Sequence, residues 1–205
     1  MSETPKVGAI ILAAGSSRRM GANKLCADLH GKSVIAHVAD AVAEAGLPGL
    51  IVLGHQAEAV RDSLGARNLI WVEASDHALG QAHSLVAGVR AIPADWDAAL
   101  ICLGDMPLVS ASLLQGMAKV ASRQSIIVPE FEGRRGNPVL WGRDWFGALQ
   151  SLSGDVGARD LLLRHSKDVT HFAWRDDSIH RDADTPQALE DLRGQQPVAK
   201  GQSAN

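Results

Sequence analysis

Short apolar runs alternate with amphipathic segments through the first two-thirds of the chain, and this alternation limits the fold more than any other feature. Short continuous apolar runs are typical of strands buried on both faces, and apolar residues spaced three and four apart are typical of helices. Alternating strands and helices imply parallel strand–helix–strand units with right-handed crossovers. The pattern predicts strands at 7–12, 50–53, 68–72, 98–103 and 125–128, and helices at 33–45, 57–64, 82–91 and 111–121.

The rhythm changes after residue 129, where a turn-rich stretch precedes a short strand that need not be parallel to the others. We therefore predict an α/β fold: a single Rossmann-like domain in which helices flank a mostly parallel mixed sheet. The domain is expected over 7–193, with an N-terminal tail at 1–6 and a flexible C-terminal tail at 194–205. The remaining elements are expected as strands at 137–141 and 169–174 and helices at 144–149, 158–164 and 187–192.

Composition and charge exclude several classes of protein. A chain of 205 residues is long enough to fold without a disulfide or metal staple. Its 20 basic and 23 acidic residues give a net charge of −3, without the basic face that nucleic-acid binding normally needs. Because no apolar run approaches the ~18 residues of a membrane span and no signal peptide is recognisable, we expect a cytoplasmic protein with no membrane partner. Cys26 and Cys102 have no metal-binding spacing, and Cys102 is expected to be a buried free thiol.

The turn after the first predicted strand carries the strongest functional signal. It reads Leu-Ala-Ala-Gly-Ser-Ser-Arg-Arg-Met-Gly-Ala-Asn-Lys over residues 12–24. Ligands of open α/β sheets bind at the carboxyl ends of the strands, and small residues there let backbone N–H groups approach an anion. The sequence fits neither a P-loop nor a dinucleotide fingerprint, because five residues separate Gly15 from Gly21 and no Gly-x-Gly-x-x-Gly occurs. We therefore predict a site for a polyphosphate.

The pattern Leu-Ala-Ala-Gly-x-Ser-x-Arg-Met-Gly-x-x-Lys resembles the signature of the nucleotidyltransferases of molybdenum cofactor biosynthesis, and more narrowly that of the cytidylyltransferases. The resemblance implies a nucleotidyltransferase domain in which Arg19 and Lys24 hold the nucleotide triphosphate. Guanylyl-transferring members tend to have Gly where this chain has Ala14, so the resemblance favours CTP over GTP. The same match implies that four residues line the base and ribose: Leu12, Ala13, Ala14 and Gly15.

Acidic residues follow a buried strand and recur near the C-terminus. Gly-Asp-Met-Pro at 104–107 matches the family and implies that Asp105 is a ligand of Mg²⁺, an ion that prefers oxygen ligands. Asp-Ala-Asp-Thr-Pro at 182–186 resembles a second family segment, in which Asp184 is the favoured second ligand and Asp182 the alternative. Asp or Thr before Pro is also ordinary chemistry for the start of a helix.

The segment Gly-Gln-Ala-His-Ser-Leu at 80–85 resembles the family's Gly-x-x-x-Ser-Leu, which implies that Gly80 and Ser84 contact the nucleotide. His83 stands where a small residue is more usual, so recognition of the base is expected to differ in detail there.

Two further segments resemble the family's acceptor side. Gly-Asn-Pro-Val-Leu at 136–140 has Asn137 in place of the usual His, and an amide can donate a hydrogen bond but cannot carry a proton. Gly-Asp-Val-Gly-Ala-Arg at 154–159 implies that Asp155 and Arg159 face the acceptor. The alternative is that Asp155 caps a helix and pairs with Arg159 one turn later.

The resemblance implies transfer of CMP from CTP to the terminal phosphate of molybdopterin, giving molybdopterin cytosine dinucleotide and pyrophosphate. Lys24, Arg19 and Asp105 are its expected catalytic residues, and a client molybdoenzyme is a further expected partner. Two alternatives stay open: a nucleotidyltransferase that uses GTP or a sugar or alcohol phosphate, and a chaperone that delivers the cofactor to molybdoenzymes. Serine hydrolases and zinc enzymes are disfavoured, since the chain has no Gly-x-Ser-x-Gly and no Cys/His cluster.

Overall fold

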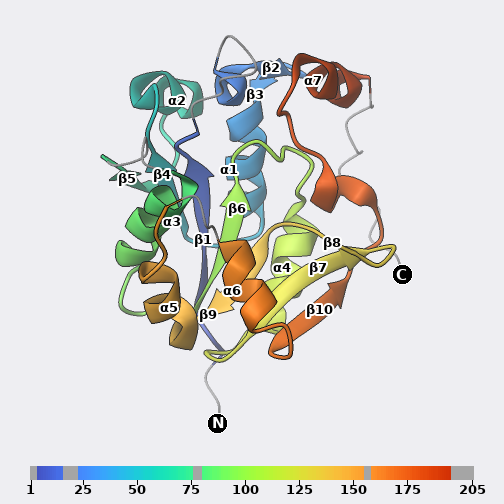
Figure 1. Ribbon diagram of the computed structural model, residues 1–205. Coiled ribbons are helices and arrows are strands. Elements are labelled where there is room, and N and C mark those ends of the chain that lie inside the picture. The colour runs from blue at the N-terminus through green and yellow to red at the C-terminus, as the bar shows by residue number, and fades with distance from the viewer. Residues whose placement is uncertain (1–3, 16–22, 76–79, 155–157, 195–205) are drawn as a thin grey trace.

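Helices cover both faces of one central sheet in the computed structural model, which describes residues 4–15, 23–75, 80–154 and 158–194 (Figure 1). The main strands are β1 (Val7–Ala13), β4 (Gly49–Leu53), β5 (Leu69–Glu73), β6 (Ala98–Leu103), β7 (Ile126–Phe131), β9 (Val139–Gly142) and β10 (Val169–Ala173). The α-helices are α1 (Val34–Glu44), α2 (Ala57–Leu64), α3 (Gln81–Arg90), α4 (Ala111–Lys119), α5 (Phe146–Gln150), α6 (Ala158–Arg164) and α7 (Pro186–Arg193). All the predicted strands and helices are therefore present, with ends that differ by a few residues.

The sheet order is β10-β7-β9-β6-β1-β4-β5. Strands β1, β4, β5 and β6 are parallel, as are β7 and β10, whereas β9 runs antiparallel to both of its neighbours. The mostly parallel mixed sheet expected from the sequence is confirmed, including the different direction of the strand near residue 140. Because β1 has β4 on one side and β6 on the other, the chain reverses its direction of winding at β1, where α/β sheets bind their ligands.

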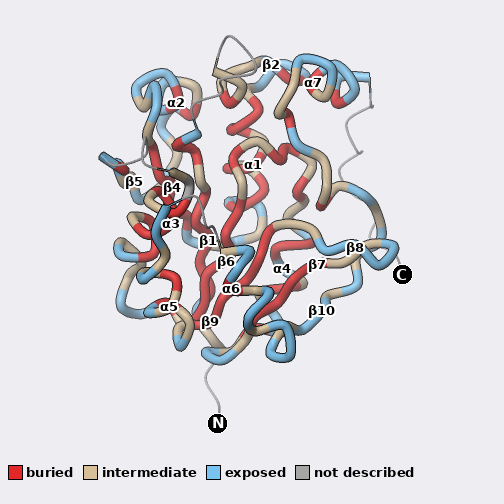
Figure 2. The backbone as a smooth tube through the Cα atoms, viewed as in Figure 1, coloured by how far each residue is buried: buried red, intermediate tan, exposed pale blue. Residues whose placement is uncertain are grey.

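Each face of the sheet has its own apolar core, since side chains alternate along every strand. Ile10 and Ile11 are both fully buried but belong to opposite cores. Helices α1, α2 and α4 cover the core that contains Ile11, and α3, α5 and α6 cover the one that contains Ile10. Figure 2 shows the central strands as almost continuously buried. This burial on both faces is why the strands read as uninterrupted apolar runs.

Several short elements were not predicted. These are the antiparallel pair β2 (Asp28–Leu29) and β3 (Lys32–Ser33), strand β8 (Arg134–Arg135), which pairs with β7, and the 3₁₀ helices η1 (Lys24–Cys26), η3 (Arg143–Trp145) and η4 (Asp177–His180). A strand of two residues is too short to show an alternation of apolar and polar positions. The turn of the β2–β3 pair is left-handed, with φ of 53° at His30 and 81° at Gly31.

No helix in the part of the chain that the structure describes has the length and apolar character to span a membrane. The tail expected at 194–205 lies almost wholly outside the described residues, as do residues 1–3.

Candidate active site

The end of β6 is pressed against the end of β1, and this contact fixes the position of Asp105. The backbone N–H of Gly104 donates a 3.0 Å hydrogen bond to the carbonyl oxygen of Leu12. A Cβ atom at Gly104 would lie 2.8 Å from that oxygen and 2.6 Å from Cδ1 of Ile35, so only glycine fits without a shift of its neighbours. The backbone of Asp105 therefore lies at the carboxyl edge of the sheet, directly beside the end of β1.

The segment before α7 reaches the same edge. Ala183 is fully buried, and its backbone N–H donates a 2.9 Å hydrogen bond to the carbonyl oxygen of Asp105. The Thr185 hydroxyl accepts a hydrogen bond from the backbone N–H of Ala188 and so caps α7, with Pro186 in its first turn. The chain is thereby held on both sides of Asp184.

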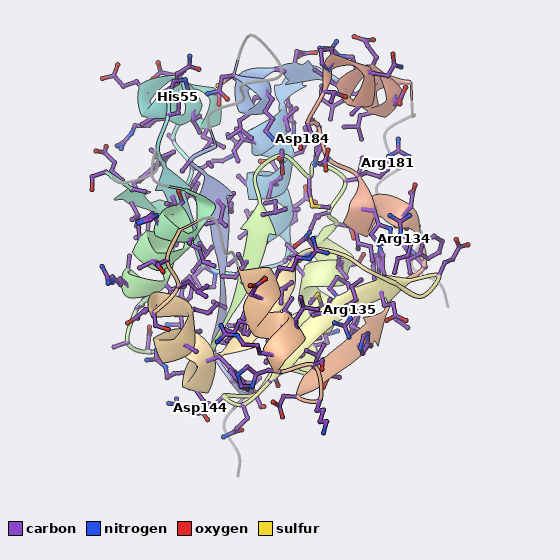
Figure 3. All side chains as sticks on the ribbon, viewed as in Figure 1. His55, Arg134, Arg135, Asp144, Arg181 and Asp184 are labelled. Atoms are coloured by element: carbon purple, nitrogen blue, oxygen red, sulfur yellow. The ribbon has the colours of Figure 1, made fainter. Side chains whose placement is uncertain are left out.

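Of the two candidate C-terminal acids, Asp184 shares the Lys24 ammonium with Asp105, and Asp182 lies close enough to affect the charge of Asp105. An oxygen of the Asp182 carboxylate accepts a 3.1 Å hydrogen bond from the backbone N–H of Asp184, so this side chain turns back on its own backbone. Asp182 is also exposed. Figure 3 shows Asp184 on the side of the sheet toward which β1 and β6 run.

Lys24 joins the two acidic segments. Its Nζ forms ion pairs with Oδ2 of Asp105 and with Oδ1 of Asp184, although these residues are 81 and 160 positions away in the sequence. The exposed fraction of the side chain is 13% for Lys24, 18% for Asp105 and 42% for Asp184. The structure thus brings together the three charged residues that the sequence analysis had assigned to triphosphate and metal binding.

The helix η1 holds Lys24 in this place. The Asn23 side-chain oxygen accepts a 3.1 Å hydrogen bond from the backbone N–H of Leu25 and caps the helix, and Leu25 is buried in the core. Nδ2 of Asn23 is also buried and has no hydrogen-bond partner among the described residues. Asn23 was not among the residues predicted for the site. An Asn directly before a short helical turn is a recognisable cap signal, but the buried, unpartnered Nδ2 that makes Asn23 a candidate ligand-binding residue is visible only in the structure.

The charges of the three groups shift one another's pKa values. Burial acts to lower the pKa of Lys24, but the negative charges of Asp105 and Asp184 outweigh it and raise that pKa. Burial raises the pKa of Asp105; Lys24 opposes this shift, while the nearby carboxylates of Asp184 and Asp182 add to it. Oδ1 of Asp105 is buried without a hydrogen-bond partner in the described part of the chain.

The donor set fits a divalent cation such as Mg²⁺ or Mn²⁺. Two carboxylates supply hard oxygen ligands, and the unpaired buried oxygen of Asp105 is satisfied by a positive partner. Across residues 4–15, 23–75, 80–154 and 158–194, no cluster of three or more acidic, His or Cys side chains is arranged to hold a metal. In proteins, Mg²⁺ commonly takes one or two carboxylates, and substrate phosphates and water complete its coordination.

The residues expected to bind the nucleotide line the same edge, as far as they are described. Ala13 and Ala14 are buried, Leu12 is partly buried, and Gly15 is exposed with open space where a side chain would start. Arg19 lies outside the described residues.

Helix α3, which packs against β1 and β4, begins after Gly80, whose φ of 125° is accessible mainly to glycine. Ser84 is the buried polar residue of this helix, and Nδ1 of His83 is buried without a partner among the described residues. The departure at His83 from the family pattern therefore concerns a side chain that is partly inside the protein.

The acceptor-side residues are only partly assembled. The backbone N–H of Asn137 donates a 3.0 Å hydrogen bond to the carbonyl oxygen of Ile179 in η4, which places Asn137 against the segment that leads to Asp184. A Cβ atom on Gly136 would lie 2.5 Å from the same oxygen, so this approach also requires glycine. Arg159 is exposed at the start of α6, and Asp155 lies outside the described residues, so both the expected acceptor role of the two residues and the alternative pair between them stay predictions.

The MobA-like NTP transferase domain matches residues 9–169 by its sequence profile, a stretch that includes Lys24 and Asp105. The chain belongs to the MobA-like NTP transferase family. It is therefore a member of a nucleotidyltransferase family, and the coarse part of the resemblance is confirmed. The matched stretch ends before Asp184, which joins the site through the contacts described above.

Relatives of known sequence or structure agree with this assignment. The bifunctional protein GlmU of Sinorhizobium fredii is 34% identical over 167 residues, which are 79% of this chain and 34% of that protein. The chain thus spans about a third of the length of the curated relatives it matches.

Similar folds occur among solved structures. Rv0371c of Mycobacterium tuberculosis H37Rv superposes with a TM-score of 0.85 at 25% identity, covering 94% of this chain and 100% of the other. Its complex with manganese has a TM-score of 0.78 at 24% identity, with 91% and 97% covered. Molybdopterin-guanine dinucleotide biosynthesis protein A of Archaeoglobus fulgidus has a TM-score of 0.64 at 15% identity, with 91% and 96% covered. The last two likenesses concern the fold alone.

Proposed function

We propose that this nucleotidyltransferase transfers CMP from CTP to the terminal phosphate of molybdopterin carrying molybdenum, with release of pyrophosphate. The observation that carries the proposal is the meeting of Lys24, Asp105 and Asp184 at the carboxyl edge of the sheet, beside the loop after β1. A cationic group and two carboxylates are what a triphosphate and its divalent ion require of a protein. The resemblance of separate sequence segments between residues 12 and 186 to those of the cytidylyltransferases supports the choice of nucleotide and acceptor.

The reaction needs no nucleophile from the protein, because an oxygen of the acceptor phosphate attacks the α-phosphorus. The new P–O bond forms as the bond from the α-phosphorus to its bridging oxygen breaks, and pyrophosphate takes both electrons of that bond. The chain must therefore align the acceptor with the α-phosphorus and neutralise the charge that develops on the phosphate oxygens. Lys24 neutralises charge on the triphosphate, with Arg19 as its expected partner from the same loop.

Asp105 and Asp184 are the residues that would hold the divalent ion. When bound, such an ion acts as a Lewis acid toward phosphate oxygens and orients the leaving group. The hydrogen bond between Ala183 and Asp105, together with the cap of α7, holds the backbone that carries Asp184 beside the backbone of Asp105.

Preference for CTP rests on Ala14, whose buried methyl group occupies the end of β1 where guanylyl-transferring members tend to have glycine. A methyl group at this position narrows the space for a base, which favours the smaller pyrimidine. The buried Ser84 and the partly buried His83 on α3 are the further polar groups that would contact the base.

The test is the release of pyrophosphate from each of CTP, GTP, UTP and ATP, with Mg²⁺ or Mn²⁺ and with molybdopterin, a sugar 1-phosphate or an alcohol phosphate as acceptor. We expect turnover with CTP and molybdopterin. Turnover with GTP only would overturn the nucleotide assignment, and turnover with another phosphate would overturn the acceptor. Tight binding of the mature cofactor without pyrophosphate release in any combination would favour the chaperone.

Asp105→Asn tests the site itself, and Asp144→Asn is its matched control. Asp144 lies at the opposite end of the sheet, as Figure 3 shows. We expect Asp105→Asn to lower the rate on the order of 100-fold or more, since charge stabilisation at the phosphates is lost. Asp144→Asn should retain the wild-type rate. Equal rates for the wild type and Asp105→Asn would reject this site.

A further inference from the structure

The position between the two acidic side chains is already filled by a positive charge. Nζ of Lys24 touches one oxygen of Asp105 and one oxygen of Asp184. A divalent ion shared by these carboxylates would lie against the ammonium, whether it contacts these oxygens or the unpartnered Oδ1 of Asp105. The ammonium and the ion therefore repel each other and compete for the same two carboxylates.

Lys24 is held in this place by the backbone around it. The Asn23 cap, the burial of Leu25 and a 3.2 Å hydrogen bond from the backbone N–H of Ala27 to the Lys24 carbonyl oxygen fix the first atoms of the side chain. The charged end is the part that can move, because four flexible CH₂ groups separate it from the backbone. A triphosphate bound along the loop after β1 offers this end a stronger negative partner.

We propose that Lys24 is an internal counter-ion of the Asp105–Asp184 pair, so that a divalent ion binds tightly between these carboxylates only after a triphosphate has drawn the ammonium away. The inference rests on the proposed function for the identity of the triphosphate. It adds an order to the reaction: nucleotide and metal bind cooperatively, and the metal alone binds weakly. The residue that helps to bind the substrate is thus also the residue that keeps the empty site from taking up metal.

The charge count supports this order. With Lys24 in place, the three side chains carry a net charge of −1, and the attraction for a divalent ion is correspondingly small. With Lys24 turned toward a triphosphate, the two carboxylates carry −2, which matches the ion. Cooperativity of this kind is reciprocal, so metal must increase the affinity for the triphosphate by the same factor.

The experiment measures Mn²⁺ binding without nucleotide, by calorimetry and by the electron paramagnetic resonance signal of free Mn²⁺, on the full chain after treatment with EDTA. Lys24→Met removes the charge and keeps the length of the stem, and Lys24→Gln is a second neutral variant that can still donate hydrogen bonds. We expect both to bind Mn²⁺ at least about tenfold more tightly than the wild type. A tenfold change corresponds to about 1.4 kcal/mol.

Two controls keep the interpretation specific. Lys24→Arg retains a positive charge at the position and should bind Mn²⁺ as weakly as the wild type. Lys32→Met removes a lysine that pairs with Asp40 elsewhere on the surface, and it should leave Mn²⁺ binding unchanged. The melting temperature in EDTA and after addition of Mn²⁺ gives an independent measure, in which Mn²⁺ should stabilise Lys24→Met more than the wild type.

The inference fails if neither neutral variant gains affinity for Mn²⁺, or if Lys32→Met gains as much. Its failure is distinguishable from failure of the proposed function, because Mn²⁺ binding is measured without turnover. If the wild type releases pyrophosphate but the neutral variants gain no affinity, only the counter-ion role is rejected. If the neutral variants gain affinity for Mn²⁺ but the wild type turns over no nucleotide, the counter-ion role stands and the proposed reaction is rejected.

Discussion

Removal of the Lys24 charge is expected to destabilise the folded protein when no metal is present. Breaking a buried ion pair from one side costs about 3–5 kcal/mol, because the remaining charge is left unpaired. Here the Asp184 side chain is 42% exposed, so water screens that half of the interaction, whereas Asp105 is only 18% exposed. We therefore expect Lys24→Met to lower the free energy of unfolding by about 2–3 kcal/mol, or the melting temperature by about 4–12 °C.

A double-mutant cycle tests this reasoning more sharply than the single variant. Asp105→Asn alone leaves Lys24 paired with Asp184 and should cost about 1 kcal/mol. In Lys24→Met/Asp105→Asn no buried carboxylate is left without its partner, so the double variant should be more stable than the sum of the single effects by about 1–2 kcal/mol.

The assay is equilibrium unfolding in urea at pH 7 with EDTA present. The control is Lys32→Met, whose side chain is 51% exposed and whose loss should cost no more than about 0.5 kcal/mol. Strictly additive effects of Lys24→Met and Asp105→Asn would refute the reasoning, since they would mean that the two groups do not interact in solution.

Three further predictions concern residues around the site and in the core. Lys32 and Arg67 hold the pKa of Asp40 below its usual range despite burial of that carboxyl. Asp40→Asn should therefore lower the free energy of unfolding above about pH 4, and this loss should vanish as the pH falls and the wild-type Asp40 is protonated. Urea unfolding from pH 3 to 7 measures the effect, with Asp62→Asn, at an exposed position, as control. Gly104→Ala should destabilise the protein by about 1–3 kcal/mol, measured by urea unfolding, because the added methyl group overlaps the backbone at the end of β1. Burial raises the pKa of the Cys102 thiol to about 12. A thiol reagent at pH 8 should therefore modify Cys26 alone in the folded protein and both thiols after unfolding. Fast reaction of both thiols in native buffer would contradict the buried position of Cys102.

The fold could be predicted well from the sequence because the apolar patterns of its main strands and helices extend over many residues. Each central strand is buried on both faces, and each covering helix has a wide apolar stripe. The spacing of the apolar residues and the length of each run therefore indicate the same type of element over many residues. The elements that were missed are two or three residues long, such as β2, β3 and η1, and their conformations are set by contacts with distant segments. Helix α7, for instance, packs beside β2 through hydrogen bonds from Arg193 to the carbonyl oxygen of Asp28.

The site was predicted in its members but not in its arrangement. Motifs pointed to Lys24, Asp105 and Asp184 separately, but their ion pairs span 81 and 160 positions and have no local signal. The sequence analysis favours Asp184 over Asp182 as the second metal ligand, and the structure adds that one oxygen of Asp182 accepts a hydrogen bond from the backbone N–H of Asp184; the choice stays a prediction. The structure shows which of these side chains lie together, whereas the catalytic, nucleotide-binding, metal-binding and acceptor roles of all the site residues, Lys24, Asp105 and Asp184 included, stay predictions.

The reversed direction of β9 separates the connection that contains Asn137 from the loop that follows β1 along the chain. Because β9 runs antiparallel to β6, with Val139 beside Ile101, the chain enters β9 at the carboxyl edge of the sheet, where β6 ends. The connection that contains Asn137 can therefore be lengthened, shortened or exchanged at that edge while the parallel strands on the nucleotide side keep their places. If this connection contacts the acceptor, as the sequence resemblance implies, a lineage with this architecture can change which phosphate it accepts while the residues around Lys24 and Asp105 stay in place.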